Sequence, residues 1–146
     1  MCNRKEIVIM AIKMKILHYP ENGKMATFAS GLSEVYDVKC DKIPPAYNCD
    51  KERLLIAGIS SKKNFSDDLS MFLRGLTKEQ VQNVAIFTDS KDDAIDAMKA
   101  AIESAGAKVV DVKKVKGAPL PFLKGVKAEE MEDLKAWANT VIENIK

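Results

Sequence analysis

The chain has 146 residues, of which 47% are hydrophobic and 30% are charged, and its 23 basic and 21 acidic residues leave a net charge of +2. This composition is that of a folded domain with one sizeable core and excludes a disordered chain. The near balance of charge argues against nucleic acid or an anionic membrane as a partner. No apolar run of the sequence approaches the roughly 20 residues that a membrane span needs.

The cysteine and histidine content argues against both a disulfide framework and a zinc site. The chain has an odd number of cysteines, Cys2, Cys40 and Cys49, and none of them forms a C-x-x-C pair. Its single histidine is His18. Metal sites of this kind need clustered Cys and His ligands. We therefore expect reduced thiols, no metal and a cytoplasmic protein.

Residues 1–13 precede the point where a compact α/β fold would begin, and we expect them to be an N-terminal extension. Residues 4–6 can be encoded AGA-AAG-GAG, a bacterial ribosome-binding sequence at a suitable distance upstream of Met10. One interpretation is that the first nine residues are translated leader in a bacterial protein, whose native start is Met10 or Met14. The alternative is that Ile7–Met10 extend or pair with the first strand.

From residue 14 onward, apolar runs typical of buried strands alternate with amphipathic stretches typical of helices. The predicted strands are residues 15–19, 35–40, 54–59, 84–87 and 108–115. The predicted helices cover residues 23–32, 66–76, 91–105 and 128–145. Ser90 is the expected N-cap of the third helix, and Gly106 is its expected left-handed stop.

This alternation predicts an α/β fold with a doubly wound parallel sheet and right-handed crossovers. The third and fourth strands are continuously apolar and should be central, whereas the second and fifth alternate and should be edges. A five-stranded sheet of order 2-1-3-4-5 satisfies both conditions. Such sheets bind ligands at the carboxyl ends of strands one and three. Three predicted loops frame that crevice, at residues 20–23, 60–64 and 88–92.

Several segments from residue 14 onward resemble the short-chain flavodoxin family in their order and spacing. They read MKILHY, KMATFASGL, LLIAGIS, VAIFTDS, AMKAAIESAGAKVV and PFLKGVKAEEMEDLKAWANTVI. The resemblance implies a single flavodoxin-like domain over residues 14–146, FMN as cofactor and electron transfer as function. The candidate cofactor-binding residues around the crevice are Tyr19, Asn22, Gly23, Lys24, Ser60, Ser61, Thr88, Asp89 and Ser90.

The first crevice loop departs from the family, whose turn is rich in Ser, Thr and Gly. Here it is shorter, it reads PENG, and Glu21 brings a negative charge to the place of a phosphate. The amides of Gly23 and Lys24 are still available to an anion at a helix N-terminus. We expect that Asn22 caps this helix or that Glu21 fills the anion site itself.

The second and third crevice loops contain no aromatic residue that could stack on a flavin ring. The nearest candidates are Tyr19, Tyr47 and Phe65. One hypothesis is a flavin-free or weakly binding module that recognises a small anion or a protein partner. The other is a divergent flavodoxin that holds FMN through Tyr19 or Tyr47 and the amides of its short first loop. We see no nucleophile–base pair that would indicate an enzyme.

A few further polar residues near the crevice have ordinary structural explanations. Lys62 and Lys63 can attract an anion, although lysine pairs in loops are usually just solvated. Asp92 and Asp93 open a predicted helix, where carboxylates offset the helix dipole. We expect His18, late in the first strand, to be a structural histidine.

Overall fold

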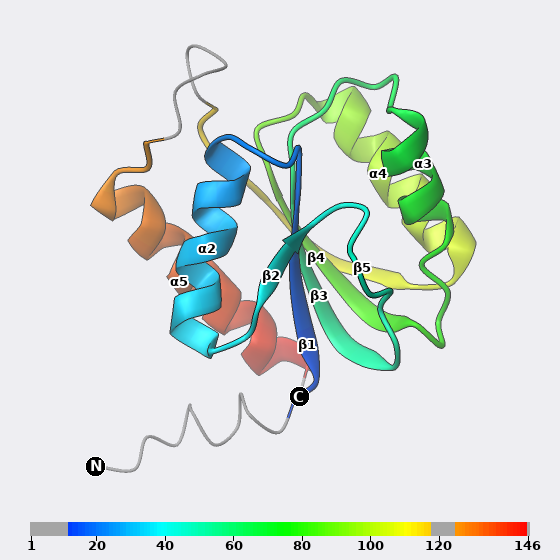
Figure 1. Ribbon diagram of the computed structural model, residues 1–146, viewed down its shortest axis with the longest axis horizontal. Helices are drawn as coiled ribbons and strands as arrows, with labels where there is room; N and C mark the ends of the chain where they lie inside the picture. The colour runs from blue at the N-terminus through cyan, green and yellow to red at the C-terminus, as the bar shows by residue number, and fades with distance from the viewer. Residues whose placement is uncertain (1–11, 118–124, 146) are drawn as a thin grey trace.

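A five-stranded parallel sheet with two helices on each face forms the protein (Figure 1). The computed structural model describes residues 12–117 and 125–145. The strands are β1 (Met14–Tyr19), β2 (Cys40–Lys42), β3 (Glu52–Ile59), β4 (Val81–Thr88) and β5 (Lys108–Lys114). The helices are α2 (Lys24–Tyr36), α3 (Asp67–Arg74), α4 (Asp92–Ala105) and α5 (Ala128–Ile145). The strand order is β2-β1-β3-β4-β5, which confirms the predicted topology.

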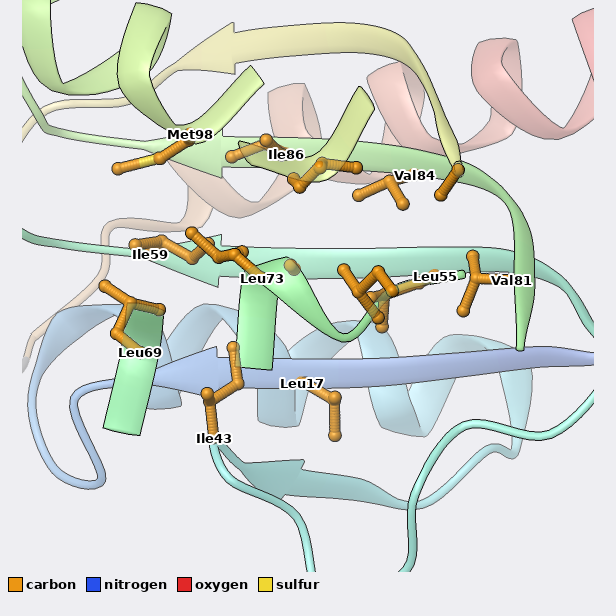
Figure 2. Close-up of a cluster of buried hydrophobic side chains, with 14 of the residues drawn as sticks. Leu17, Ile43, Leu55, Ile59, Leu69, Leu73, Val81, Val84, Ile86 and Met98 are labelled. Carbon is orange, nitrogen blue, oxygen red and sulfur yellow. The ribbon is translucent and has the colours of Figure 1, made fainter. Parts of the chain in front are cut away.

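The central position of β3 follows from a run of apolar side chains that has no wet face. Leu55, Ala57 and Ile59 pack with α3 and α4 on one face of the sheet (Figure 2). Leu54 and Ile56 pack with α2 and α5 on the other face. Because successive side chains of a strand point to opposite faces, a run with no polar break needs a helix layer on both sides.

The second predicted strand, residues 35–40, is wrong, because α2 continues through Tyr36 and β2 begins at Cys40. Tyr36 follows Leu32 by four residues, so the apolar spacing of the helix still holds there. The Tyr36 ring is buried, and its hydroxyl donates to Asn139 Oδ1 at 2.6 Å. Burial also raises the pKa of Tyr36 to about 12, which keeps this donor protonated. The helix ends at Asp37, whose φ is 53°.

The predicted N-cap at Ser90 is also wrong, since α4 begins one residue later than expected. Its N-cap is Lys91, and no side chain caps this end of the helix. Ser90 is buried, and its Oγ accepts the N–H of Ser61 at 3.0 Å. The predicted stop at Gly106 is confirmed by a φ of 125°, which favours glycine.

The predicted leader, the start sites at Met10 or Met14 and the pairing of Ile7–Met10 stay predictions. All but Met14 lie outside the described residues. Across residues 12–117 and 125–145, no helix has both the length and the apolar character to cross a membrane.

Gly58, near the end of β3, leaves the space that the Phe87 ring of β4 fills. It pairs with His18 on β1 and Phe87 on β4. An added Cβ would lie 2.2 Å from two atoms of the fully buried Phe87 ring. We expect Gly58→Ala to lower the free energy of unfolding by about 1–3 kcal/mol, because the ring must move within a packed core.

Chemical denaturation of wild type and variant measures this effect. The control is Gly125→Ala, where an added Cβ meets nothing within 4 Å. It should change the free energy of unfolding by less than about 0.5 kcal/mol. Equal effects of the two substitutions would contradict the importance of the space that the ring fills.

Candidate functional site

The carboxyl ends of β1, β3 and β4 meet at one end of the sheet, the upper end in Figure 1. The Ser60 N–H donates to the Tyr19 carbonyl at 2.8 Å, which joins the chain after β3 to the end of β1. The Val115 N–H donates to the Thr88 carbonyl at 2.9 Å, which joins the ends of β5 and β4. This edge is the place where doubly wound sheets of this order bind their ligands.

The loops after β3 and β4 enclose an open cavity of about 780 Å³, which we call the crevice hollow. Its lining residues are Ser60, Ser61, Lys62, Lys63, Asn64, Asp89, Ser90, Lys91, Asp93 and Ala94. Four of the candidate residues from the sequence line it together: Ser60, Ser61, Asp89 and Ser90. Lys91 also lines the hollow and was not among the candidate residues predicted from the sequence, although its place in the third crevice loop was a usable signal.

Hydroxyl groups of Thr88 and Ser90 hold the two loops in place. The fully buried Thr88 Oγ1 accepts the Ser90 N–H at 2.9 Å. Ser90 Oγ in turn accepts the Ser61 N–H at 3.0 Å. Thr88 does not line the crevice hollow. These two hydroxyls, which we expected to contact a ligand, instead fix the shape of the hollow.

The first crevice loop lies apart from the other two. Asn22 and Gly23 line a different cavity, of about 710 Å³, between α2 and α5. The expected capping by Asn22 is wrong, because the N-cap position falls on Gly23, which has no side chain to cap with. The Glu21 carboxylate also does not fill the site, since it bonds to no group in the described part of the chain. The first N–H groups of α2 are therefore left without a side-chain acceptor.

Tyr19 and Lys24 also make their contacts away from the crevice hollow. The Tyr19 hydroxyl donates to Ser66 Oγ at 2.8 Å, and Ser66 is the N-cap of α3. The Lys24 ammonium donates to Glu130 Oε2 at 2.9 Å, with only 8% of the Lys24 side chain exposed. The same ammonium lies 5.7 Å from the centre of the Phe28 ring. Lys24 lines a third cavity, of about 620 Å³, between the ends of β5, α2 and α5.

Glu130 is the partner that ties the start of α2 to the start of α5. Its second oxygen accepts the Lys127 N–H at 3.0 Å. The Lys127 N–H and then the Lys24 ammonium lower the pKa of the Glu130 carboxyl. The sequence carried no signal for this pair, because 106 residues separate Lys24 from Glu130.

The three aromatic candidates do not line the crevice hollow. Tyr19 is bonded to Ser66 as described, and Phe65 packs beside the core under α3 and α4. Tyr47 is 83% exposed, and its carbonyl accepts from the Lys15 ammonium at the start of β1.

The remaining polar candidates have structural roles. His18 is buried, and its Nδ1 lies 3.1 Å from the Pro20 carbonyl oxygen. Cys40 and Cys49 are free thiols, and burial raises the pKa of Cys49 to about 11. Within the described residues, no group of three His, Cys, Asp or Glu side chains is arranged to hold a metal ion.

Comparison with known proteins shows the fold. No family model and no curated protein sequence matches the chain. A solved structure that does match is that of two-electron reduced flavodoxin from Megasphaera elsdenii in solution. It is 17% identical, with a TM-score of 0.51, and the match covers 87% of this chain and 98% of the flavodoxin. The chain is therefore an α/β protein of flavodoxin-like fold, and at this identity the likeness establishes the fold alone.

Ser90→Ala removes the hydroxyl that accepts the partly buried N–H of Ser61 and so links the loops after β3 and β4. We expect the free energy of unfolding to fall by about 1–2 kcal/mol. Amide hydrogen exchange at Ser61 should accelerate at the same time. Ser61→Ala is the matched control, because its hydroxyl bonds only to the adjacent Lys62 carbonyl. Unchanged exchange at Ser61 in the Ser90 variant would contradict the proposed link.

Glu130→Gln should lower the free energy of unfolding more at neutral pH than at acid pH. The folded protein lowers the pKa of Glu130 below its usual 4.5, so the carboxylate stabilises the fold above that pH. This stabilisation disappears as pH falls through the lower, folded pKa. Unfolding by denaturant should therefore separate variant from wild type at about pH 7, and the difference should shrink as pH falls through the lowered pKa of Glu130. A difference that does not depend on pH would contradict this assignment.

Proposed function

We propose that this chain is a flavodoxin-like binding module that holds FMN weakly or not at all. Its crevice hollow would then serve a small anion or a protein partner. The observation that carries the proposal is that no aromatic side chain is among the described residues that line the hollow. Stacking contributes roughly 1–3 kcal/mol per ring, by analogy with nucleic-acid bases, and every 1.4 kcal/mol is about tenfold in affinity.

The first loop supports the same proposal. Pro20 has no N–H to offer, and Glu21 places an unpaired negative charge beside the start of α2. Asn22 and Gly23 face a cavity separate from the crevice hollow. A ligand with its phosphate at the start of α2 and its ring in the crevice hollow would have to span both cavities.

The free thiols at Cys40 and Cys49 fit a reducing compartment, so we also propose a cytoplasmic location.

A divergent FMN-binding electron carrier is the second candidate, and one observation favours it. The start of α2 has no side-chain cap, and the space beside Gly23 is open, because an added Cβ would meet nothing within 4 Å. Backbone N–H groups at a helix start can bind a phosphate. If FMN binds, those of α2 are the groups available to its phosphate.

Titration of FMN fluorescence separates the two candidates. We expect colourless purified protein and a dissociation constant for FMN above about 100 µM. Micromolar quenching of FMN would contradict the proposed function and support the second candidate. Two further titrations then test the role of α2. One uses riboflavin, which lacks the phosphate, and the other uses the variant Glu21→Gln, which lacks the negative charge. If FMN binds there, riboflavin should bind more weakly and the variant should bind FMN more tightly.

A further inference from the structure

Three lysines with no partner line the crevice hollow, and they come from both of its loops. Lys62 and Lys63 follow β3, and Lys91 follows β4. Their side chains make no hydrogen bond or ion pair with any described residue. Elsewhere in the described chain Lys24 and Lys114 are paired with carboxylates at 2.9 and 2.5 Å. The hollow therefore gathers three positive charges that no described residue holds in an ion pair.

The two carboxylates of the hollow do not offset these amines fully. Asp93 Oδ1 already accepts the Ala94 N–H at 2.7 Å. The Asp89 carboxylate lies against Gly117, where an added Cβ would be 2.6 Å from Oδ2. The described lining thus carries three lysines and two aspartates, which leaves a formal net charge of +1.

Neutral donors in the same hollow suit the oxygens of an anion. Ser60 and Asn64 line it with polar side chains that can donate hydrogen bonds. The start of α4 also borders the hollow, and no side chain caps it. Asp92 and Asp93 lie in its first turn and offset its dipole, so the lysines carry the attraction for negative charge.

We propose that the crevice hollow binds a small phosphorylated ligand without an aromatic ring, through Lys62, Lys63 and Lys91. This inference rests on the proposed function, in which the hollow is the ligand site. Ammonium groups attract phosphate as point charges, and three of them match several phosphate oxygens. None of the described residues that line the hollow offers a stacking surface, which disfavours a nucleobase or flavin as the main contact.

The test uses inorganic tripolyphosphate as the probe and the full chain labelled with nitrogen-15. At constant ionic strength, we expect saturable shifts in the amide signals of Ser61, Lys62, Asp92 and Asp93. The triple variant Lys62→Gln, Lys63→Gln, Lys91→Gln should bind at least about tenfold more weakly, as expected for lost charge-assisted contacts. Circular dichroism establishes that the variant is folded.

The control variant makes the same change of charge outside the hollow, at the exposed residues Lys78, Lys99 and Lys108. It should retain the wild-type affinity within about twofold. Equal losses in both variants, or unsaturable shifts over the whole surface, would overturn the inference. Citrate binding more tightly than tripolyphosphate would overturn the choice of phosphate.

The two proposals can fail separately. Micromolar FMN binding would defeat the proposed function, whatever tripolyphosphate does. Weak FMN binding together with no binding of tripolyphosphate would defeat only the inference about the lysines and would leave a protein partner as the occupant of the hollow.

Discussion

Side chains of β3 and β4 are buried on both faces of the sheet. This burial on two sides determines where the helices and the crevice loops lie. Two helices must cover each face, so a helix crossover follows each central strand: α2 after β1 covers one face, and α3 and α4 after β3 and β4 cover the other. In a parallel sheet these crossings all begin at the carboxyl edge. The loops after β3 and β4 are therefore neighbours, although the residues that line the hollow from these loops are all polar.

Much of this architecture is present in the sequence as pattern. The continuous apolar run of residues 54–59 and the lysine-rich alternation of residues 108–115 distinguish a central strand from an edge strand. The strand predicted at residues 35–40 was wrong because Tyr36 fits two patterns. It is one of the apolar residues of an alternating, strand-like stretch, and it also follows Leu32 by four residues, which is the spacing of a helix. In the fold Tyr36 is buried beside Leu32 and bonds to Asn139 of the last helix, and a local pattern holds no information about that distant contact.

The candidate site was harder to predict for a related reason. Nine residues were assigned to one crevice because they follow strands that end at one edge, and this reasoning gives the edge but not the direction of each side chain. Ser90 and Thr88 turn inward to backbone N–H groups, and Lys24 turns to Glu130 on a distant helix. Polar groups at a sheet edge bond to whatever lies nearest, and that neighbour is fixed only by tertiary packing.

The bond between Ser90 and Ser61 has a consequence for any ligand of the crevice. It fastens the loop that carries Lys91 to the loop that carries Lys62, so the two backbones are joined before a ligand arrives. A guest that contacts both loops then does not have to bring them together, and less conformational entropy is lost when it binds. The remaining loss falls on the flexible lysine side chains alone.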